Sequence, residues 1–241
     1  MKTEDMAYLD GAVNLNGFLA WDESARERRP GVLVIHEAWG LGTHALAKTN
    51  MLAELGYVAF AADMFGDRRQ ARVIEDMAGL LDGIHDDPAR LRARAQAGLS
   101  TLASLPQVDT TRLAVIGFCF GGTTALELAR GGTDLAGAVC FHGGLTTTAP
   151  AAPGAIKASI LVCNGALDPS VPRSQIVAFE EEMLAAGADW QLINYGEATH
   201  SFTNPVADGS VKPYFLYHER SDRRSWAATT SFLAEVLGSR D

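Results

Sequence analysis

Residues 113–130 read LAVIGFCFGGTTALELAR. An apolar run typical of a buried strand leads into the turn Gly117-Phe118-Cys119-Phe120-Gly121, and a helix-like segment follows it. A strand, a sharp turn and a helix in this order form a nucleophile elbow, which holds its central residue under backbone strain where a substrate reaches it. Small residues at Gly117 and Gly121 prevent clashes between the strand and the helix. The stretch predicts an open α/β sheet with Cys119 as a nucleophile at its edge.

Strand-like runs and helical patterns alternate on both sides of this stretch. The strand-like runs cover residues 32–36, 57–62, 112–116, 136–141, 158–163 and 189–195. The helical patterns cover residues 44–56, 88–104, 121–131, 173–187 and 221–238. Such alternation is typical of a mainly parallel sheet covered by helices on both faces. We therefore predict a twisted sheet of about seven or eight strands in a single α/β domain over residues 1–241.

Three local features complete the predicted architecture. Residues 14–20 predict an antiparallel strand at the edge of the sheet. Residues 67–87 break the alternation with a charged, helix-like stretch over 68–82, and we interpret them as a small lid beside the site. Asp63 ends a strand, and its carboxylate is expected to brace the turn that follows.

An elbow nucleophile needs a base, and the base needs an acid that orients it, in the chain order nucleophile, acid, histidine. Asp168 lies in a turn-rich loop after one apolar strand, and His200 lies in the loop after the next strand. Asp134 and Asp189 compete for the role of the acid, but neither of them follows the strand that precedes the histidine strand. We therefore expect a triad of Cys119, His200 and Asp168.

Four further motifs accompany the elbow. They read IHEAWGL at residues 35–41, DMFG at 63–66, DPSVP at 168–172 and HSF at 200–202. Together with the elbow they resemble the dienelactone hydrolase family of α/β-hydrolases, from about Gly11 to the C-terminus. The resemblance implies the α/β-hydrolase fold and cofactor-free hydrolysis of ester or lactone bonds through a cysteinyl acyl intermediate. It also implies that a glutamate after the first core strand, Glu37 in this chain, is a partner of the cysteine.

Glu37 and His200 are expected to act in opposite directions on Cys119. A protonated histidine favours the thiolate, whereas a facing carboxylate favours the neutral thiol. If Glu37 faces the thiol, the resemblance implies that substrate binding moves Glu37 away and lets His200 take over. The oxyanion hole is expected at the backbone N–H groups of Phe120 and Ala38.

The resemblance also bears on the substrate. Dienelactone hydrolases hold a substrate carboxylate with arginines, one of them four residues after the catalytic histidine, where this chain has Asn204. Since an amide supplies neither the charge nor the fork of a guanidinium, we predict that neutral esters or lactones compete well with carboxylated ones. Arg68, Arg69 and Arg72 are alternative cations, although charged helix residues are more often a solvated face. The candidate substrate-binding residues are Trp39, Phe118, His142, Phe202 and Asn204.

The other cysteines and histidines are interpreted as uninvolved in the chemistry. Cys140 and Cys163 lie inside apolar strands, where a free cysteine behaves as a small buried hydrophobe. His44, His85 and His218 have no cysteine or acid pattern around them and are predicted to be solvated. No metal site is expected, because the zinc-protease helix motif that begins with histidine and glutamate needs a second histidine four residues after the first.

Composition limits the remaining classes of function. The chain has 20 Lys and Arg against 29 Asp and Glu, a formal net charge of −9, which disfavours nucleic acids and anionic membranes as partners. No apolar run approaches the roughly 18 residues of a membrane span, and the N-terminus lacks an apolar signal segment, so we expect a cytoplasmic location. A small-molecule ester or lactone is the expected partner of a monomer or homodimer.

Two alternatives to a hydrolase remain open. The same scaffold could bind or sense a small molecule with little turnover, although a receptor has no need for a complete triad. A thiol redox protein is disfavoured, because no Cys-x-x-Cys is present and the other two cysteines lie in strands.

Overall fold

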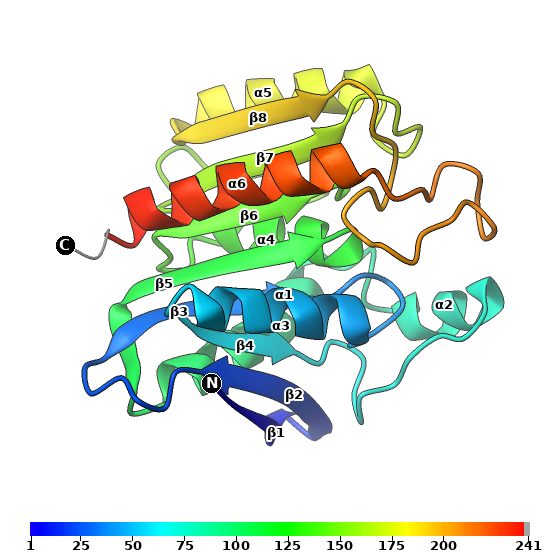
Figure 1. Cartoon of the computed structure of the whole chain (residues 1–241). Coiled ribbons are helices and arrows are strands. Elements are labelled where there is room, and N and C mark those ends of the chain that lie inside the picture. Colours follow the sequence, from blue (N-terminus) through cyan, green and yellow to red (C-terminus); the bar gives the residue numbers. More distant parts are fainter. Residues whose placement is uncertain (239–241) are drawn as a thin grey trace.

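The computed structural model describes residues 1–238, so the last three residues of the predicted domain lie outside the described residues. Eight strands form one twisted sheet in the order β1-β2-β4-β3-β5-β6-β7-β8 (Figure 1). Strands β3 to β8 are parallel, and β1 and β2 are antiparallel at one edge. The strands are β1 (Lys2–Asp10), β2 (Val13–Trp21), β3 (Arg29–Ile35), β4 (Val58–Ala62), β5 (Val108–Phe118), β6 (Gly137–Phe141), β7 (Ser159–Gly165) and β8 (Trp190–Tyr195).

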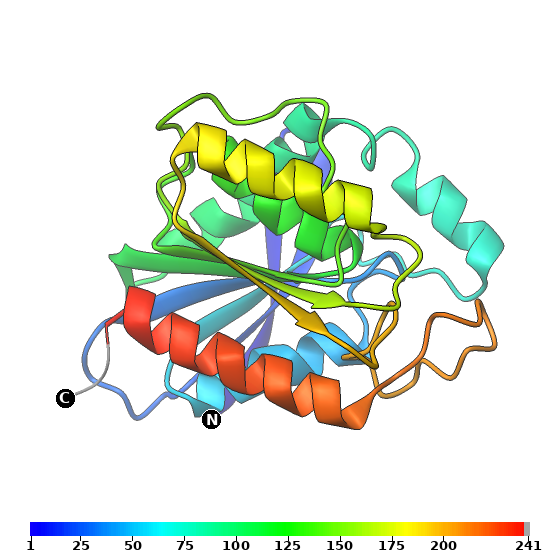
Figure 2. The same ribbon diagram turned by 90° about the horizontal axis from the view of Figure 1, so that it is seen from above.

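Helices cover both faces of the sheet (Figure 2). One face carries α3 (Pro88–Ala103), α4 (Phe120–Arg130) and α5 (Arg173–Ala186), and the other carries α1 (Thr43–Glu54) and α6 (Glu219–Val236). The short helix α2 (Ile74–Leu81) stands apart, beyond the carboxyl ends of the strands. The arrangement confirms the predicted fold class, a mainly parallel α/β sheet of the α/β-hydrolase type with helices on both sides.

Two apolar layers bury the sheet. Alternate residues of a strand point to opposite faces, so β3 sends Leu33 toward the α3 and α4 side and Val34 toward the α1 and α6 side. Both side chains are fully buried. Because both faces are covered, the central strands are continuous apolar runs instead of alternating ones. This continuity is why the sequence predicts them well.

The first strand was not predicted. β1 pairs with β2 over its full length through a hairpin at Gly11, whose φ of +58° suits glycine. The first residues of β1 are exposed and charged, as is common for a strand at the open edge of a sheet. Tyr8 and Asp10 nevertheless anchor it, since the Tyr8 hydroxyl donates to the Asp63 carbonyl and Asp10 accepts a hydrogen bond from Arg94 at 2.6 Å.

The segment between β4 and α3 is less helical than its charge pattern indicates. A helix predicted over residues 68–82 is wrong in its first half, since α2 begins only at Ile74. A tight turn precedes it, with φ of +53° at Arg68, and Asp63 accepts hydrogen bonds from the backbone N–H groups of Phe65, Gly66 and Arg68. The brace expected of Asp63 is therefore confirmed, and it fixes the start of the segment that leads to α2.

Candidate active site

The carboxyl ends of parallel strands meet at one edge of the sheet, and the predicted catalytic residues all follow such ends. Glu37 follows β3, Cys119 follows β5, Asp168 follows β7 and His200 follows β8. Residues from four separate parts of the chain are thereby brought together.

Backbone strain holds Cys119 at the tip of the elbow. Its φ of +54° and ψ of −116° lie outside the ordinary regions for a residue with a side chain. A Cβ atom on Gly117 would stand 1.9 Å from the Gly121 carbonyl oxygen, and one on Gly121 would stand 2.2 Å from the Ile35 oxygen. Only glycine fits at both positions, and the Cys119 side chain consequently remains half-buried and open to a cavity.

Cys119, His200 and Asp168 form one hydrogen-bonded line. The Cys119 Sγ is 3.0 Å from His200 Nε2, and His200 Nδ1 is 2.7 Å from Asp168 Oδ2. The other oxygen, Asp168 Oδ1, accepts the backbone N–H of Ser170 at 2.8 Å. Both the histidine and the aspartate are buried. The arrangement has the distances that a nucleophile, a base and an orienting acid require.

The charges around His200 favour its protonated form. Burial alone would lower the pKa of His200, but the neighbouring Cys119 thiolate and the Asp168 carboxylate raise it to about 10. The His200 ring also stacks on Phe215, with 4.9 Å between ring centroids. The structure thus favours the imidazolium form of His200 at neutral pH.

The competing acids lie at other places. Asp189 accepts a hydrogen bond from the Ser159 hydroxyl at 2.7 Å, and Asp134 faces Lys157 at 3.7 Å. All four residues lie at the starts of strands β6, β7 and β8, the opposite edge from His200: Asp134 and Lys157 lie before β6 and β7, Ser159 begins β7, and Asp189 directly precedes β8.

Two residues near the nucleophile have backbone N–H groups without an acceptor in the described part of the chain. Neither the N–H of Ala38 nor that of Phe120 has a hydrogen-bond acceptor within residues 1–238. Both residues line the same cavity as Cys119, and Phe120 is the first residue of α4. Donors left without a partner at a helix start are suited to a developing negative charge.

Glu37 lies beside Asn204 and His44 and makes no hydrogen bond to the Cys119 thiol. Its Oε2 accepts the Asn204 side-chain N–H at 2.6 Å and is 3.5 Å from His44 Nδ1. Burial raises the pKa of Glu37, but His44, Asn204 and the charge on His200 outweigh it and lower the pKa below its usual value. The carboxylate is therefore ionised, and the hydrogen-bonding partner of Cys119 is His200.

The prediction that His44 is solvated is wrong. Its side chain is only 8% exposed, and its Nε2 lies 3.4 Å from the Thr203 hydroxyl. Thr203 is in turn 2.8 Å from His142 Nε2, so a buried polar chain connects His142 to Glu37. His44 stands in the first turn of α1, directly after the loop that carries Glu37. That position at the carboxyl edge was the available signal.

Two cavities flank this group of residues. The Cys119 cavity, of about 570 Å³, is lined by Ala38, Met77, Leu81, His85, Asp86, Pro88, Leu91, Cys119, Phe120, Thr123, Glu127, Gly144, Thr146, Thr147, Thr148, Ser170, Gln175 and His200. The Glu37 cavity, of about 310 Å³, lies on the other side of the loop after β3, and its lining includes Glu37, Trp39, His44, Asn204 and Phe215. Trp39 and Asn204 thus line a cavity next to the one that contains the thiol.

Three candidate substrate-binding residues lie in neither cavity. Phe118 is fully buried on the α1 and α6 side of the sheet, where its ring stacks on Phe141 at 4.7 Å. Phe202 is buried against His142, whose ring in turn packs 5.3 Å from that of His200. The elbow turns neighbouring side chains in opposite directions, so Phe118 points into the core while Cys119 points outward. The structure therefore places these rings in packing positions.

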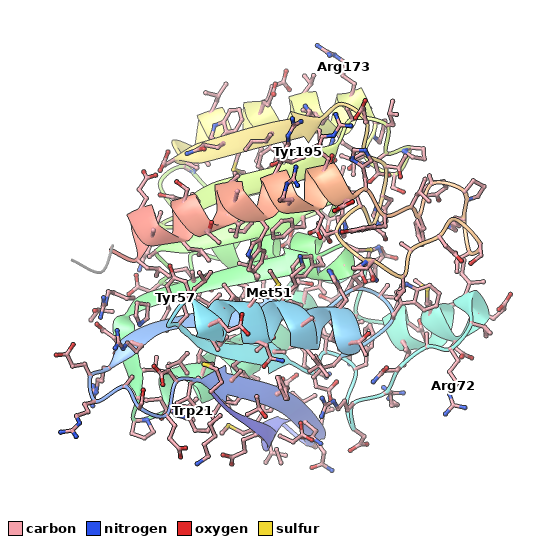
Figure 3. All side chains as sticks on the ribbon, in the orientation of Figure 1. Trp21, Met51, Tyr57, Arg72, Arg173 and Tyr195 are labelled. Atoms are coloured by element: carbon pink, nitrogen blue, oxygen red, sulfur yellow. The ribbon has the colours of Figure 1, made fainter. Side chains whose placement is uncertain are left out.

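The alternative arginines are engaged elsewhere. Arg68 pairs with Asp5 at 2.6 Å, and Arg69 donates hydrogen bonds to the Phe65 carbonyl within its own turn. Arg72 is exposed and points away from the protein (Figure 3). None of the three lines the Cys119 cavity.

Cys140 and Cys163 are fully buried, as expected of strand cysteines. Burial raises the pKa of each thiol to about 12, so neither ionises at neutral pH. Of the three free cysteines, only Cys119 is partly exposed.

The comparisons with known proteins agree with this geometry. The chain matches the dienelactone hydrolase family over residues 15–237. The solved structure m3DLH is 44% identical and has a TM-score of 0.93, covering 98% of this chain and 99% of its own. A dienelactone hydrolase-like promiscuous phosphotriesterase from metagenomic libraries is 40% identical with a TM-score of 0.91, at the same coverage. A Yersinia pestis protein provisionally named a carboxymethylenebutenolidase is 29% identical, covering 82% of this chain and 74% of its own. The chain belongs to the dienelactone hydrolase family and is a hydrolase of the ester or lactone type.

Proposed function

We propose that this member of the dienelactone hydrolase family hydrolyses uncharged esters or lactones through a Cys119–His200–Asp168 triad and a cysteinyl thioester. The observation that carries the proposal is the unbroken line from Cys119 Sγ to His200 Nε2 at 3.0 Å and from His200 Nδ1 to Asp168 at 2.7 Å. The pKa of His200, raised to about 10, supports a histidine that holds a proton for the leaving group.

In the first half of the reaction, the Cys119 thiolate attacks the carbonyl carbon and forms a tetrahedral intermediate. The N–H groups of Ala38 and Phe120 stabilise its oxyanion. The intermediate then collapses, the carbon–oxygen bond to the alcohol breaks, and the His200 imidazolium donates its Nε2 proton to the leaving oxygen. The products of this half are a thioester on Cys119 and a neutral alcohol.

In the second half, His200 accepts a proton from a water molecule that attacks the thioester carbonyl. The second tetrahedral intermediate expels the thiolate, and the acid product leaves while His200 is again protonated. Asp168 holds the imidazole with Nε2 toward the thiol throughout and stabilises the imidazolium.

Glu37 is proposed to act on the charge of the site. Its carboxylate is ionised, buried and close enough to His200 for the two charges to attract each other. In the observed arrangement it stays with Asn204 and His44, and thus helps to keep His200 protonated while the thiol proton is absent.

The absence of a guanidinium from the lining of the Cys119 cavity, within the described residues, supports uncharged substrates. The short helix α2 contributes Met77 and Leu81 to that lining, and we propose that residues 67–87 serve as a small lid. A cytoplasmic location is consistent with three unpaired cysteines, since reducing compartments keep thiols free. Whether the enzyme is a monomer or a homodimer is testable by sedimentation.

Burst kinetics with p-nitrophenyl butyrate test the proposal. One equivalent of p-nitrophenol should be released before steady turnover, and acid quenching should trap a butyryl group on the peptide that contains Cys119. Cys119→Ala should lose both signals, whereas Cys163→Ala, which changes a buried cysteine, should keep them.

The same assay separates the alternatives. If the wild type turns over the ester but no acid quench traps an adduct on Cys119, the thioester mechanism is excluded. Tight binding of esters and lactones without turnover would instead favour a sensing protein. A phosphotriester belongs among the test substrates, because one similar structure is named a phosphotriesterase.

A further inference from the structure

The strand order fixes what stands on each side of Cys119. Along the carboxyl edge, β4 and β3 lie on one side of β5, and β6, β7 and β8 lie on the other. Ala38 follows β3, whereas Asp168 and His200 follow β7 and β8. One donor of the oxyanion hole and the histidine therefore lie on opposite sides of the nucleophile.

The Cys119 cavity extends to both of these sides. On the β3 and β4 side, it is lined by Met77 and Leu81 of α2 and by the buried Leu91 of α3. This apolar end is covered by α2, whose own residues are all at least partly exposed.

The other end of the cavity is polar. It is lined by Thr146, Thr147 and Thr148 in the loop after β6, and by Ser170 and Gln175 after β7. The hydroxyls of Thr146, Thr148 and Ser170 have no hydrogen-bond partner in the described part of the chain. Gln175 is already used, since its side chain accepts from the Leu145 N–H and donates to the Ser170 carbonyl.

Among the described residues that line this cavity, no charged side chain deep inside it is left unpaired. Glu127 lines it, but Arg92 at 2.7 Å and Arg130 at 3.1 Å neutralise the carboxylate. Asp86 lies at the mouth with its side chain fully exposed, so water screens it. The described lining therefore contains no lysine or arginine that could pair with a charged substrate group.

The reaction geometry fixes which half of an ester enters which end. The carbonyl oxygen must reach the N–H groups of Ala38 and Phe120, and the leaving oxygen must reach His200 Nε2. The leaving group therefore points to the side of β6, β7 and β8, and the acyl chain turns away from it toward α2.

We propose that the ester binds in one direction, with an apolar acyl group beneath α2 and an uncharged, polar alcohol group beside Thr146, Thr148 and Ser170. The proposal rests on the hydrolytic function proposed above and specifies its substrate class. Leu81 and Thr148 are its specificity-determining residues, one for each half of the ester.

Two isomeric esters test the direction. Methyl hexanoate and pentyl acetate have the same formula but carry their alkyl chain on opposite sides of the carbonyl. Wild-type kcat/KM should be higher for methyl hexanoate. Leu81→Trp, which fills the apolar end, should lower kcat/KM for methyl hexanoate about tenfold or more and change pentyl acetate less than about twofold. Thr148→Trp should lower kcat/KM for pentyl acetate about tenfold or more and change methyl hexanoate less than about twofold.

The crossed design contains its own controls. A general loss of folding lowers kcat/KM for both isomers by the same factor. In that case the smaller replacements Leu81→Phe and Thr148→Leu are compared instead, after thermal melting has shown that these variants are folded. The proposed binding direction is wrong if Leu81 variants lower kcat/KM for pentyl acetate more than for methyl hexanoate, or if every folded variant changes kcat/KM for both isomers equally. The hydrolase proposal stands in either case. If the wild type hydrolyses neither isomer and Cys119 is never acylated, both proposals fail.

The polarity of the alcohol half has a separate test. Glycerol monobutyrate and 2-methylbutyl butyrate differ by methyl groups in place of hydroxyls. Thr148→Val, which removes one unpaired hydroxyl, should lower the ratio of kcat/KM for the glycerol ester over its isostere about threefold to tenfold. Thr147→Val is the matched control, because the Thr147 hydroxyl already accepts the Ala149 N–H within the loop. An unchanged ratio in Thr148→Val, or an equal fall in both variants, would overturn the polar alcohol site.

Discussion

Replacement of Asp168 by Asn should lower kcat more than its replacement by Ala. Asp168 Oδ1 accepts the Ser170 N–H at 2.8 Å, and Oδ2 accepts from His200 Nδ1 at 2.7 Å. In Asp168→Asn, the amide oxygen must stay on the Ser170 N–H, because an NH₂ group there would face another donor. The amide NH₂ then donates to His200 Nδ1, which forces the proton of a neutral imidazole onto Nε2. A ring in that tautomer cannot accept a proton from the thiol of Cys119.

The two variants therefore lose different amounts. A wrong tautomer in a triad costs on the order of 10⁴ in kcat. Asp168→Ala loses a charged hydrogen bond, worth about 1.5 to 3 kcal/mol, or about tenfold to just over a hundredfold, and with it the support that Asp168 gives to the imidazolium. Water that fills the space of the removed carboxylate can accept or donate a hydrogen bond at Nδ1, so the His200 ring can still adopt the tautomer with a free Nε2. We expect Asp168→Ala to retain at least about tenfold more activity than Asp168→Asn.

The assay is kcat with p-nitrophenyl butyrate, with circular dichroism to check folding. Asp189→Asn is the matched control, because Asp189 bonds to Ser159 at the opposite edge of the sheet, and it should keep wild-type activity. Equal losses in Asp168→Asn and Asp168→Ala would refute the tautomer argument. Wild-type activity in Asp168→Asn would mean that another group orients His200.

Three further predictions follow from the same geometry. Cys119→Ser should lower the pKa of His200 from about 10, because a serine hydroxyl does not ionise and so adds no negative charge beside the ring. An unchanged pKa in an NMR titration of the His200 ring would contradict the contribution of Cys119. Gly117→Ala should abolish activity and destabilise the fold by about 1 to 3 kcal/mol, since its Cβ would meet a backbone oxygen at 1.9 Å, whereas Gly196→Ala, with nothing within 4 Å, should change melting little. Methyl hexanoate should exceed the anionic monomethyl adipate about tenfold to a hundredfold in kcat/KM, and a preference for the anion would reveal an unrecognised cation in the site.

The sequence predicted the centre of the fold better than its edge. The strands from β3 to β7 are buried on both faces, and burial on both faces leaves an apolar run that is easily recognised. β1 has only a partly buried face, and its charged residues protect an open edge, so its pattern resembles a loop. The helix predicted over residues 68–82 is absent from its first half for a different reason. Asp63 captures the backbone N–H groups of the turn, and this long-range brace has no local signature.

The candidate site was predicted where geometry follows from chain order. Cys119, Asp168 and His200 each come directly after a parallel strand, and the topology alone brings such positions together. The orientation of single side chains was less predictable. Phe118 is adjacent to Cys119 in the sequence but points into the core, because neighbouring residues around a strand end face opposite sides. His44 was missed because its partner Glu37 lies on a separate element, seven residues earlier.

The buried polar chain beside the triad keeps His142 neutral. Burial, together with the charge on His200, holds the pKa of His142 well below its usual value, so His142 stays neutral only 5.3 Å from the His200 ring. A second cation at that distance would oppose the protonation of His200. Glu37 adds an ionised carboxylate on the far side of the same chain. Since neutral His142 does not repel the imidazolium while Glu37 and Asp168 attract it, the surroundings stabilise the protonated state of His200.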